Sequence, residues 1–97
     1  MNNSEQFYIV RADRAGVFFG KVKSKDANSV IMTEVRKIFY WEGASAVEQI
    51  ATDGVSKPND CKLTVIVDEM EIFTPIQIIP CSKKSILSLQ AIREWKN

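Results

Sequence analysis

The chain has 97 residues, of which 45% are hydrophobic, and its 13 basic and 12 acidic residues leave a formal net charge of +1. A chain of this length builds one modest core, so we expect residues 1–97 to form a single domain. The near-zero charge disfavours general binding to nucleic acid or membrane surfaces, and the absence of histidine removes the commonest general base and metal ligand.

The first half of the chain predicts antiparallel strands joined by short turns. Residues 7–12 (FYIVRA) and 17–23 (VFFGKVK) are β-branched and aromatic, and they flank the turn sequence DRAG, which is typical of a hairpin. Gly20 within the second strand indicates a β-bulge or a close approach of another backbone. Residues 30–35 predict a third strand, and residues 36–42 a fourth strand or a continuation of the third after a kink.

A short helix is predicted after these strands. Glu48 follows Ser45 by three residues, which is the spacing of a capping box. Gly54 supplies a left-handed stop. The apolar stripe between them consists of Ala46, Val47, Ile50 and Ala51. Because the helix has only about two turns, tertiary packing must hold it in place.

The second half predicts two more strands and a terminal helix. We expect strands at residues 63–67 and 72–81, with the acidic segment 68–71 as the turn between them. Pro75 lacks an amide donor, which places the last strand at an edge or bends it there. Ser82 is the expected cap of the C-terminal helix. We expect Ile86, Leu89 and Ile92 to line the buried side of that helix, and Trp95 to anchor its end.

These elements predict an α+β fold that is mostly β. Short antiparallel strands with local turns favour a small curved antiparallel sheet or a partly open barrel of five to six strands, with one short inserted helix and one C-terminal helix. Cys61 and Cys81 lack the spacing of a redox or metal motif, so we expect free thiols in a reducing cytoplasm. The sequence shows no export signal and no apolar run near the ~18–20 residues of a membrane span.

Four blocks of the sequence form a larger pattern: AGVFFGKV, RKIFYWEGAS, GVSKPNDCK and IIPCSKKSILSL followed by a tryptophan. They resemble a family of small proteins of unknown function that are encoded by bacteriophages and prophages, and the resemblance covers nearly the whole chain. This chain has Asn59 and Asp60 where the family pattern has Glu-Asn. The resemblance implies a phage origin and a bacterial cytoplasmic location, and it implies no activity.

The first candidate site is the corner between the predicted strands and the short helix. Gly43 would let a ligand approach the backbone, and the helix amides after Ser45 would hold an anion. Tyr40 or Trp41 would stack on a base or a sugar. The alternative is structural, with Trp41 in the core, Gly43 making the turn and the capping box already satisfying the amides.

Basic residues are the expected contacts of an anionic ligand. Arg36, Lys57 and Lys62 are placed to meet phosphate or carboxylate groups. Lys83 is included because a lysine in the first turn of a helix is locally unfavourable unless an anion is bound there. Cys81 beside that helix end would have a lowered thiol pKa. The alternative is a pair of solvated lysines over a buried cysteine.

Two further groups are weaker candidates. The carboxylates of Asp68, Glu69 and Glu71 would bind Mg²⁺ weakly, and Arg11 and Arg14 would form a phosphate fork. Solvated turns explain both groups at least as well. We therefore expect no metal site and no cofactor.

No set of residues combines a nucleophile, a base and an orienting group, so we expect no catalytic residues and no enzyme activity. The favoured hypothesis is a phage or prophage accessory protein that binds a host or phage protein, or its own copies in a small homo-oligomer. Its aromatic residues, Phe18, Phe19, Tyr40 and Trp41 among them, exceed what one face of a small sheet needs and suit an interface. The alternatives are sequestration of an anionic nucleotide-type molecule and nucleic-acid binding by a small barrel, which the near-zero charge makes the weakest of the three.

Overall fold

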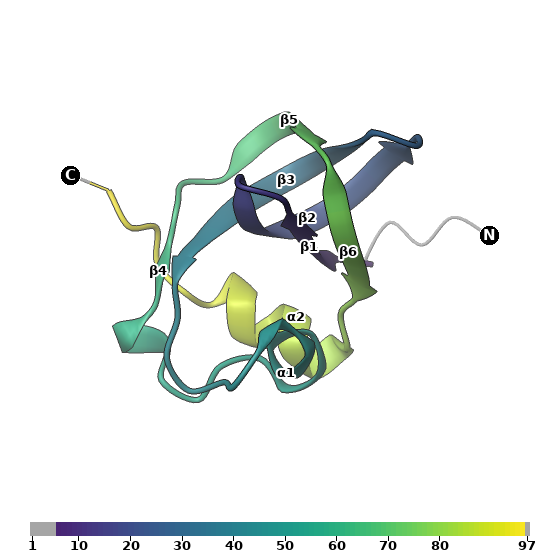
Figure 1. The fold of residues 1–97 in the computed structure, drawn as a ribbon. Coiled ribbons are helices and arrows are strands. Elements are labelled where there is room, and N and C mark those ends of the chain that lie inside the picture. The colour runs from purple at the N-terminus through teal and green to yellow at the C-terminus, as the bar shows by residue number, and fades with distance from the viewer. Residues whose placement is uncertain (1–5, 97) are drawn as a thin grey trace.

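The computed structural model describes residues 6–96 as a strongly curved sheet with two helices against one side of it (Figure 1). The first five residues, on which the expectation of no export signal partly depends, and Asn97 lie outside this range. The strands are β1 (Tyr8–Ala12), β2 (Gly16–Lys25), β3 (Ser29–Tyr40), β4 (Lys62–Leu63), β5 (Val67–Phe73) and β6 (Pro75–Pro80). The helices are α1 (Val47–Asp53), the 3-10 segment η1 (Pro58–Asp60) and α2 (Lys83–Gln90). In the described part of the chain, no helix has both the length and the apolar character that crossing a bilayer requires.

The sheet is antiparallel throughout, with the strand order β4-β3-β2-β1-β6. β5 pairs with the first part of β3, and β4 pairs with its end. β6 follows β5 after Thr74, which has a positive φ of 57° and donates its amide to the carbonyl of Asn28. The sheet therefore bends back on itself without closing. This confirms the predicted mostly β fold with a curved six-stranded sheet, an inserted helix and a C-terminal helix.

The sheet separates two clusters of buried apolar side chains. The cluster on the helix side includes Phe7, Ile9, Phe19, Ile38, Ile50, Leu63 and Leu89. The cluster on the other face includes Val10, Phe18, Val30, Met32, Val35 and Ile72. Because neighbouring residues of a strand point to opposite faces, Phe18 and Phe19 fall into different clusters. Both are buried, so the expectation that these two aromatic residues contribute to an interface was wrong.

The predicted irregularity at Gly20 is a β-bulge between β2 and β3. The register shifts between Phe19 and Lys21, and Glu34 on the opposite strand has a positive φ of 48°. A β-carbon at Gly20 would lie 2.9 Å from the Cα of Val35. The predicted close approach is confirmed, and the third and fourth predicted strands are one bent strand, β3.

The turn between the last two predicted strands was placed wrongly. Asp68, Glu69 and Glu71 lie inside β5, where their side chains are exposed and Glu69 forms an ion pair of 3.0 Å with a lysine of β2. Among the described strands β5 pairs with β3 alone, and charged side chains are common on such edge strands. The chain reverses instead at Thr74. As Pro75 predicted, β6 is also an edge strand.

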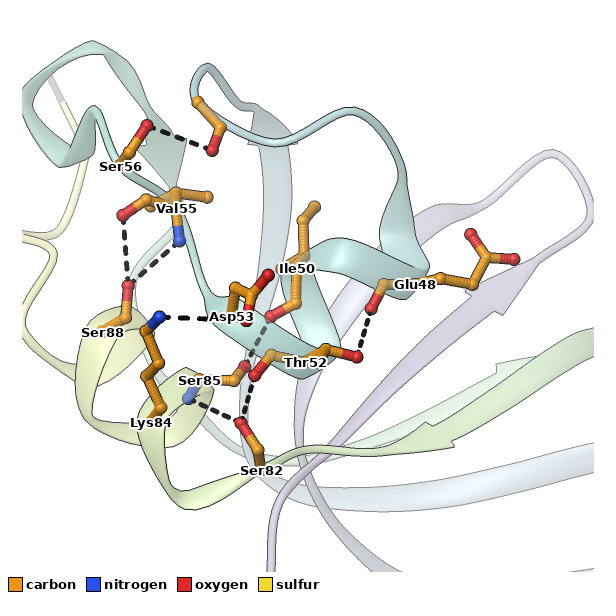
Figure 2. A network of polar contacts seen from close by, with 11 residues as sticks. Glu48, Ile50, Thr52, Asp53, Val55, Ser56, Ser82, Lys84, Ser85 and Ser88 are labelled. Carbon is orange, nitrogen blue, oxygen red and sulfur yellow. Dashed lines mark hydrogen bonds and ion pairs between the residues drawn. The ribbon is translucent and has the colours of Figure 1, made fainter.

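The two helices approach each other closely because α2 presents serines to α1 (Figure 2). Ser82, Ser85 and Ser88 are three residues apart and share one face of α2. The Ser85 hydroxyl donates to the carbonyl of Ile50 at 2.6 Å, and the Ser82 hydroxyl donates to that of Thr52 at 2.5 Å. The side chain of Ser82 also accepts from the amide of Ser85, which confirms it as the cap of α2. Serines therefore supply donors to the carbonyls at the end of α1, where the Ile50 carbonyl also accepts from the amide of Gly54.

Replacing Ser85 with alanine is expected to lower the free energy of unfolding by about 1 kcal/mol, because the buried Ile50 carbonyl loses one donor. Replacing Ser85 with valine is expected to cost about 2–3 kcal/mol, since the added volume forces the two helices apart. Urea unfolding followed by circular dichroism measures both changes. A valine variant as stable as the wild type would show that the helices are not in tight contact.

Candidate functional site

The corner between β3 and α1 is a structural joint. Trp41 is half-buried against the helix-side cluster, and its indole N–H donates to the carbonyl of Ala44 at 3.2 Å. Gly43 has a φ of 86°, and its carbonyl accepts from the amide of Ser56 at 3.2 Å. A β-carbon on Gly43 would lie 2.6 Å from the amide nitrogen of Lys57. The space beside this glycine is therefore filled by protein backbone and leaves no room for a ligand.

The predicted capping box between Ser45 and Glu48 was wrong. Ala46 is the N-cap of α1, and its side chain makes no capping bond. The carboxamide oxygen of Gln49 accepts from the amide and the hydroxyl of Ser45 at 2.8 and 2.9 Å. Glu48 instead accepts from the amide group of Gln77 on β6 at 2.9 Å, which lowers the pKa of the Glu48 carboxyl. The polar groups of Ser45 are thus already occupied.

Arg36, predicted as a ligand contact, lies in the core with 3% of its surface exposed. Its Nε donates to the carbonyl of Thr64 at 3.0 Å and its Nη1 to the carbonyl of Leu89 at 3.2 Å. Its Nη2 has no hydrogen-bond partner within the described residues. Burial lowers the pKa of the guanidinium, and the charge of Glu94 opposes this effect. Arg36 therefore ties β3 to the end of α2 and is not available at the surface.

A groove of about 950 Å³ lies between the end of β3, the η1 segment and the residues that follow α2. It brings together Tyr40, Lys57 and Lys62 among the predicted site residues. Arg93 and Trp95 also line it, although the sequence did not identify them as site residues. We call this feature the C-terminal groove.

The segment after α2 forms one wall of the C-terminal groove. The amide of Trp95 donates to the carbonyl of Leu63 at 2.8 Å, and Leu63 forms a parallel bridge with Glu94. The Trp95 ring stacks on Phe39 with 4.9 Å between ring centroids, and Nζ of Lys62 lies 5.3 Å from the centre of the Trp95 ring. These contacts confirm that Trp95 anchors the end of the chain.

The charged groups of the C-terminal groove are unevenly paired. Within residues 6–96, three exposed cations of the groove form no ion pair: Lys57, Lys62 and Arg93. Glu42 accepts from the hydroxyl of Tyr40, which raises the pKa of that phenol. Glu94 accepts from the amide of Ile66 at 3.3 Å. Oε1 of Glu94 also lies 3.8 Å from Nζ of Lys96, so the charged groups of the groove that form no ion pair within the described residues are these three cations and two carboxylates, Glu42 and Asp60.

Lys83 and Cys81 lie at the far end of α2 from the C-terminal groove. Lys83 is exposed to solvent. Nζ of its neighbour Lys84 lies 3.8 Å from Oδ1 of Asp53. Cys81 is buried, and this burial raises the pKa of its thiol to about 11. The expectation of a lowered thiol pKa was therefore wrong. Across the described residues, no group of three or more Cys, Asp or Glu side chains is arranged to hold a metal ion.

Large apolar side chains are exposed next to the groove. Phe39 is 56% exposed, Ile66 53% and Trp95 43%. Phe39 stacks on Trp95, and the amide of Ile66 binds the carboxylate of Glu94, the residue before Trp95. We call Phe39, Ile66 and Trp95 the apolar ledge. It adjoins the C-terminal groove because the two features share Trp95.

Comparison with known proteins identifies a family and no activity. A family model described as Domain of unknown function (DUF6948) matches residues 5–89. No curated protein and no solved structure matches the chain. The matched range includes the part of the C-terminal groove formed by β3 and η1, and it ends before the wall that carries Arg93 and Trp95.

Proposed function

Since the chain belongs to the family described as Domain of unknown function (DUF6948), we propose its role from its geometry: a non-catalytic accessory protein that binds a protein partner through the apolar ledge. The resemblance of its sequence blocks to small phage and prophage proteins supports a phage origin. The partner is then a host or phage protein of the bacterial cytoplasm, or a second copy of the chain. The observation that carries the proposal is the stacked and exposed pair of Phe39 and Trp95.

The apolar ledge has the composition of an interface centre. Aromatic residues dominate the energetic centres of protein interfaces, whereas charged residues surround them. Here Lys62 and Arg93 lie beside Trp95 in the groove. Full burial of one such large apolar side chain contributes about 1.5–3 kcal/mol. Contact of a partner with Phe39 and Ile66 therefore supplies a substantial part of a binding free energy.

A second candidate function is the sequestration of an anionic nucleotide-type molecule in the C-terminal groove. Lys57, Lys62 and Arg93, which form no ion pair in the described part of the chain, support it. The carboxylates of Glu42, Asp60 and Glu94 in the same groove disfavour a ligand with several closely spaced negative charges. Nucleic-acid binding is weaker still, because the formal net charge is only +1.

The ledge is tested by replacing Phe39 with serine and comparing retention of binding proteins from a bacterial lysate with the wild type. The solution mass of each variant is measured in parallel to detect self-association. We expect the Phe39→Ser variant to lose binding or self-association by about tenfold or more, as for an interface hot spot. Phe73→Ser is the matched control, because Phe73 is 62% exposed at the end of β5 and away from the ledge.

Two results would contradict the proposed function. The first is equal loss of binding in Phe39→Ser and Phe73→Ser, which would indicate non-specific adhesion. The second is a monomeric mass for the wild type together with the same retained proteins for wild type and Phe39→Ser. Circular dichroism of each variant verifies that the fold is intact.

A further inference from the structure

Three separate parts of the chain form the walls of the C-terminal groove: the end of β3, the segment 57–62, and the end of α2 with the residues after it. We infer that this groove binds an extended acidic segment of the protein partner, and that the segment carries an apolar side chain beside its carboxylates. The inference rests on the proposed function. The apolar ledge and the groove would then be parts of one recognition surface, joined at Trp95.

The unpaired cations supply the charge complementarity for this inference. Lys57, Lys62 and Arg93 come from the η1 end, β4 and the chain after α2, and all three are exposed. The ring of Trp95 lies 5.3 Å from Nζ of Lys62, which favours an ammonium position over the aromatic face. A carboxylate that enters the groove therefore meets cations that give up no ion pair with any residue in the range 6–96 when they bind it.

The aromatic walls supply contacts for an apolar side chain. Tyr40 is 46% exposed and Trp95 43%, so each presents part of its ring to the groove. Pro58 adds an apolar surface in η1, and Ile92, which is 6% exposed, belongs to the core beneath. Aromatic and proline side chains of this kind line the grooves that recognise extended peptides.

The mixed charge of the groove favours a peptide over a phosphate-bearing ligand. A phosphate group brings a charge of about −1.5 to −2, which Asp60 and Glu42 would repel. Phosphate sites also commonly use backbone amides of glycine-rich loops, and residues 57–62 read KPNDCK without a glycine. A peptide carboxylate carries one charge and fits between separate cations, while other peptide groups face Asp60.

The inference is tested with a displayed library of random peptides selected on the wild-type protein. We expect the selected peptides to be enriched in Asp and Glu next to an aromatic, aliphatic or proline residue. The tightest peptide is then synthesised, and its affinity is measured by fluorescence anisotropy for the wild type and for Lys57→Glu/Lys62→Glu. That double variant is expected to bind at least about tenfold more weakly, a change of about 1.4 kcal/mol.

The matched control is Lys25→Glu/Lys83→Glu, which makes the same charge change at exposed lysines outside the groove. Its affinity is expected to stay within about twofold of the wild type, since distant surface charges are screened. Selection without enrichment of acidic residues, or equal weakening by both double variants, would overturn the inference. Displacement of the peptide by ATP or by single-stranded DNA at lower concentration than by free peptide would also overturn it, in favour of a phosphate ligand.

Failure of this inference is distinguishable from failure of the proposed function. If Phe39→Ser abolishes partner binding but no acidic peptide is selected, the ledge binds the partner and the groove does not. If the peptide binds and Phe39→Ser leaves partner binding unchanged, the inference about the groove holds and the proposed role of the ledge fails.

Discussion

Replacing Gly43 with alanine is expected to lower the free energy of unfolding by about 3 kcal/mol. Its φ of 86° costs an L-residue with a side chain about 1–2 kcal/mol. The added β-carbon would also lie 2.6 Å from the amide nitrogen of Lys57 and 2.7 Å from that of Ser56. Backbone atoms cannot swing aside as the end of a side chain does, so the loop must shift. Because Lys57 lines the C-terminal groove, the amide resonances of residues 56–57 and 59–62 should move as well.

Gly16→Ala is the matched control for this prediction. Gly16 also has a positive φ, of 114°, but its added β-carbon would meet only the end of the Lys37 side chain, at 2.9 Å from Cε. That flexible group can move away at low cost, so we expect only the cost of the positive φ, a loss of about 1–2 kcal/mol. Urea unfolding of both variants measures the difference. Equal losses would show that the approach of the loop to Gly43 is not tight.

Features set by a single residue type could be predicted from the sequence. Gly20 predicted the bulge between β2 and β3, since only a residue without a β-carbon fits against Val35. Gly54 predicted the end of α1, where it has a φ of 78° and donates its amide to the carbonyl of Ile50. Ser82 predicted the start of α2. For Gly54 and Ser82 local chemistry decides the backbone conformation, and for Gly20 the missing β-carbon permits the approach of Val35.

Features that depend on distant partners could not be predicted. Arg36 reads as a surface cation, and its burial follows from a contact with Leu89, 53 positions along the chain. The C-terminal groove likewise requires the segment after α2 to lie along β4, where Leu63 pairs with Glu94. Patterns within a short window report which face is apolar, and they do not report which distant segment covers it. Tyr40, Lys57 and Lys62 were identified individually, but the wall opposite them was not.

Local rules also failed where two residues competed for one role. Ser45 and Glu48 have the spacing of a capping box, yet the side chain that accepts from the amide of Ser45 is that of Gln49. The reason lies outside the helix, because Gln77 on β6 binds the Glu48 carboxylate and holds it away from Ser45. The contact of a sheet residue with Glu48 therefore accompanies the bond of Ser45 to Gln49 and the absence of the expected capping box. The sequence therefore suggested a ligand site at this corner, where the groups of Ser45 are already bonded to Gln49.

Replacing Arg36 with lysine is expected to destabilise the protein more than replacing it with methionine, although lysine keeps the charge. A single ammonium cannot reach the carbonyls of both Thr64 and Leu89, and it is buried without a carboxylate partner, so we expect a loss of about 3 kcal/mol. Methionine fills a similar volume without a charge to desolvate. It leaves the Thr64 carbonyl without this donor, and we expect a loss of about 1–2 kcal/mol.

The pH dependence of unfolding separates these two causes. Burial lowers the pKa of the introduced lysine in the folded state, whereas in the unfolded chain it stays near its usual ~10.4. Between these two pKa values the unfolded state binds more protons, so the stability of Arg36→Lys rises with pH. Its deficit relative to Arg36→Met should therefore shrink between pH 7 and pH 10 in urea unfolding. A constant deficit over this range would mean that lost packing, and not a buried charge, weakens the lysine variant.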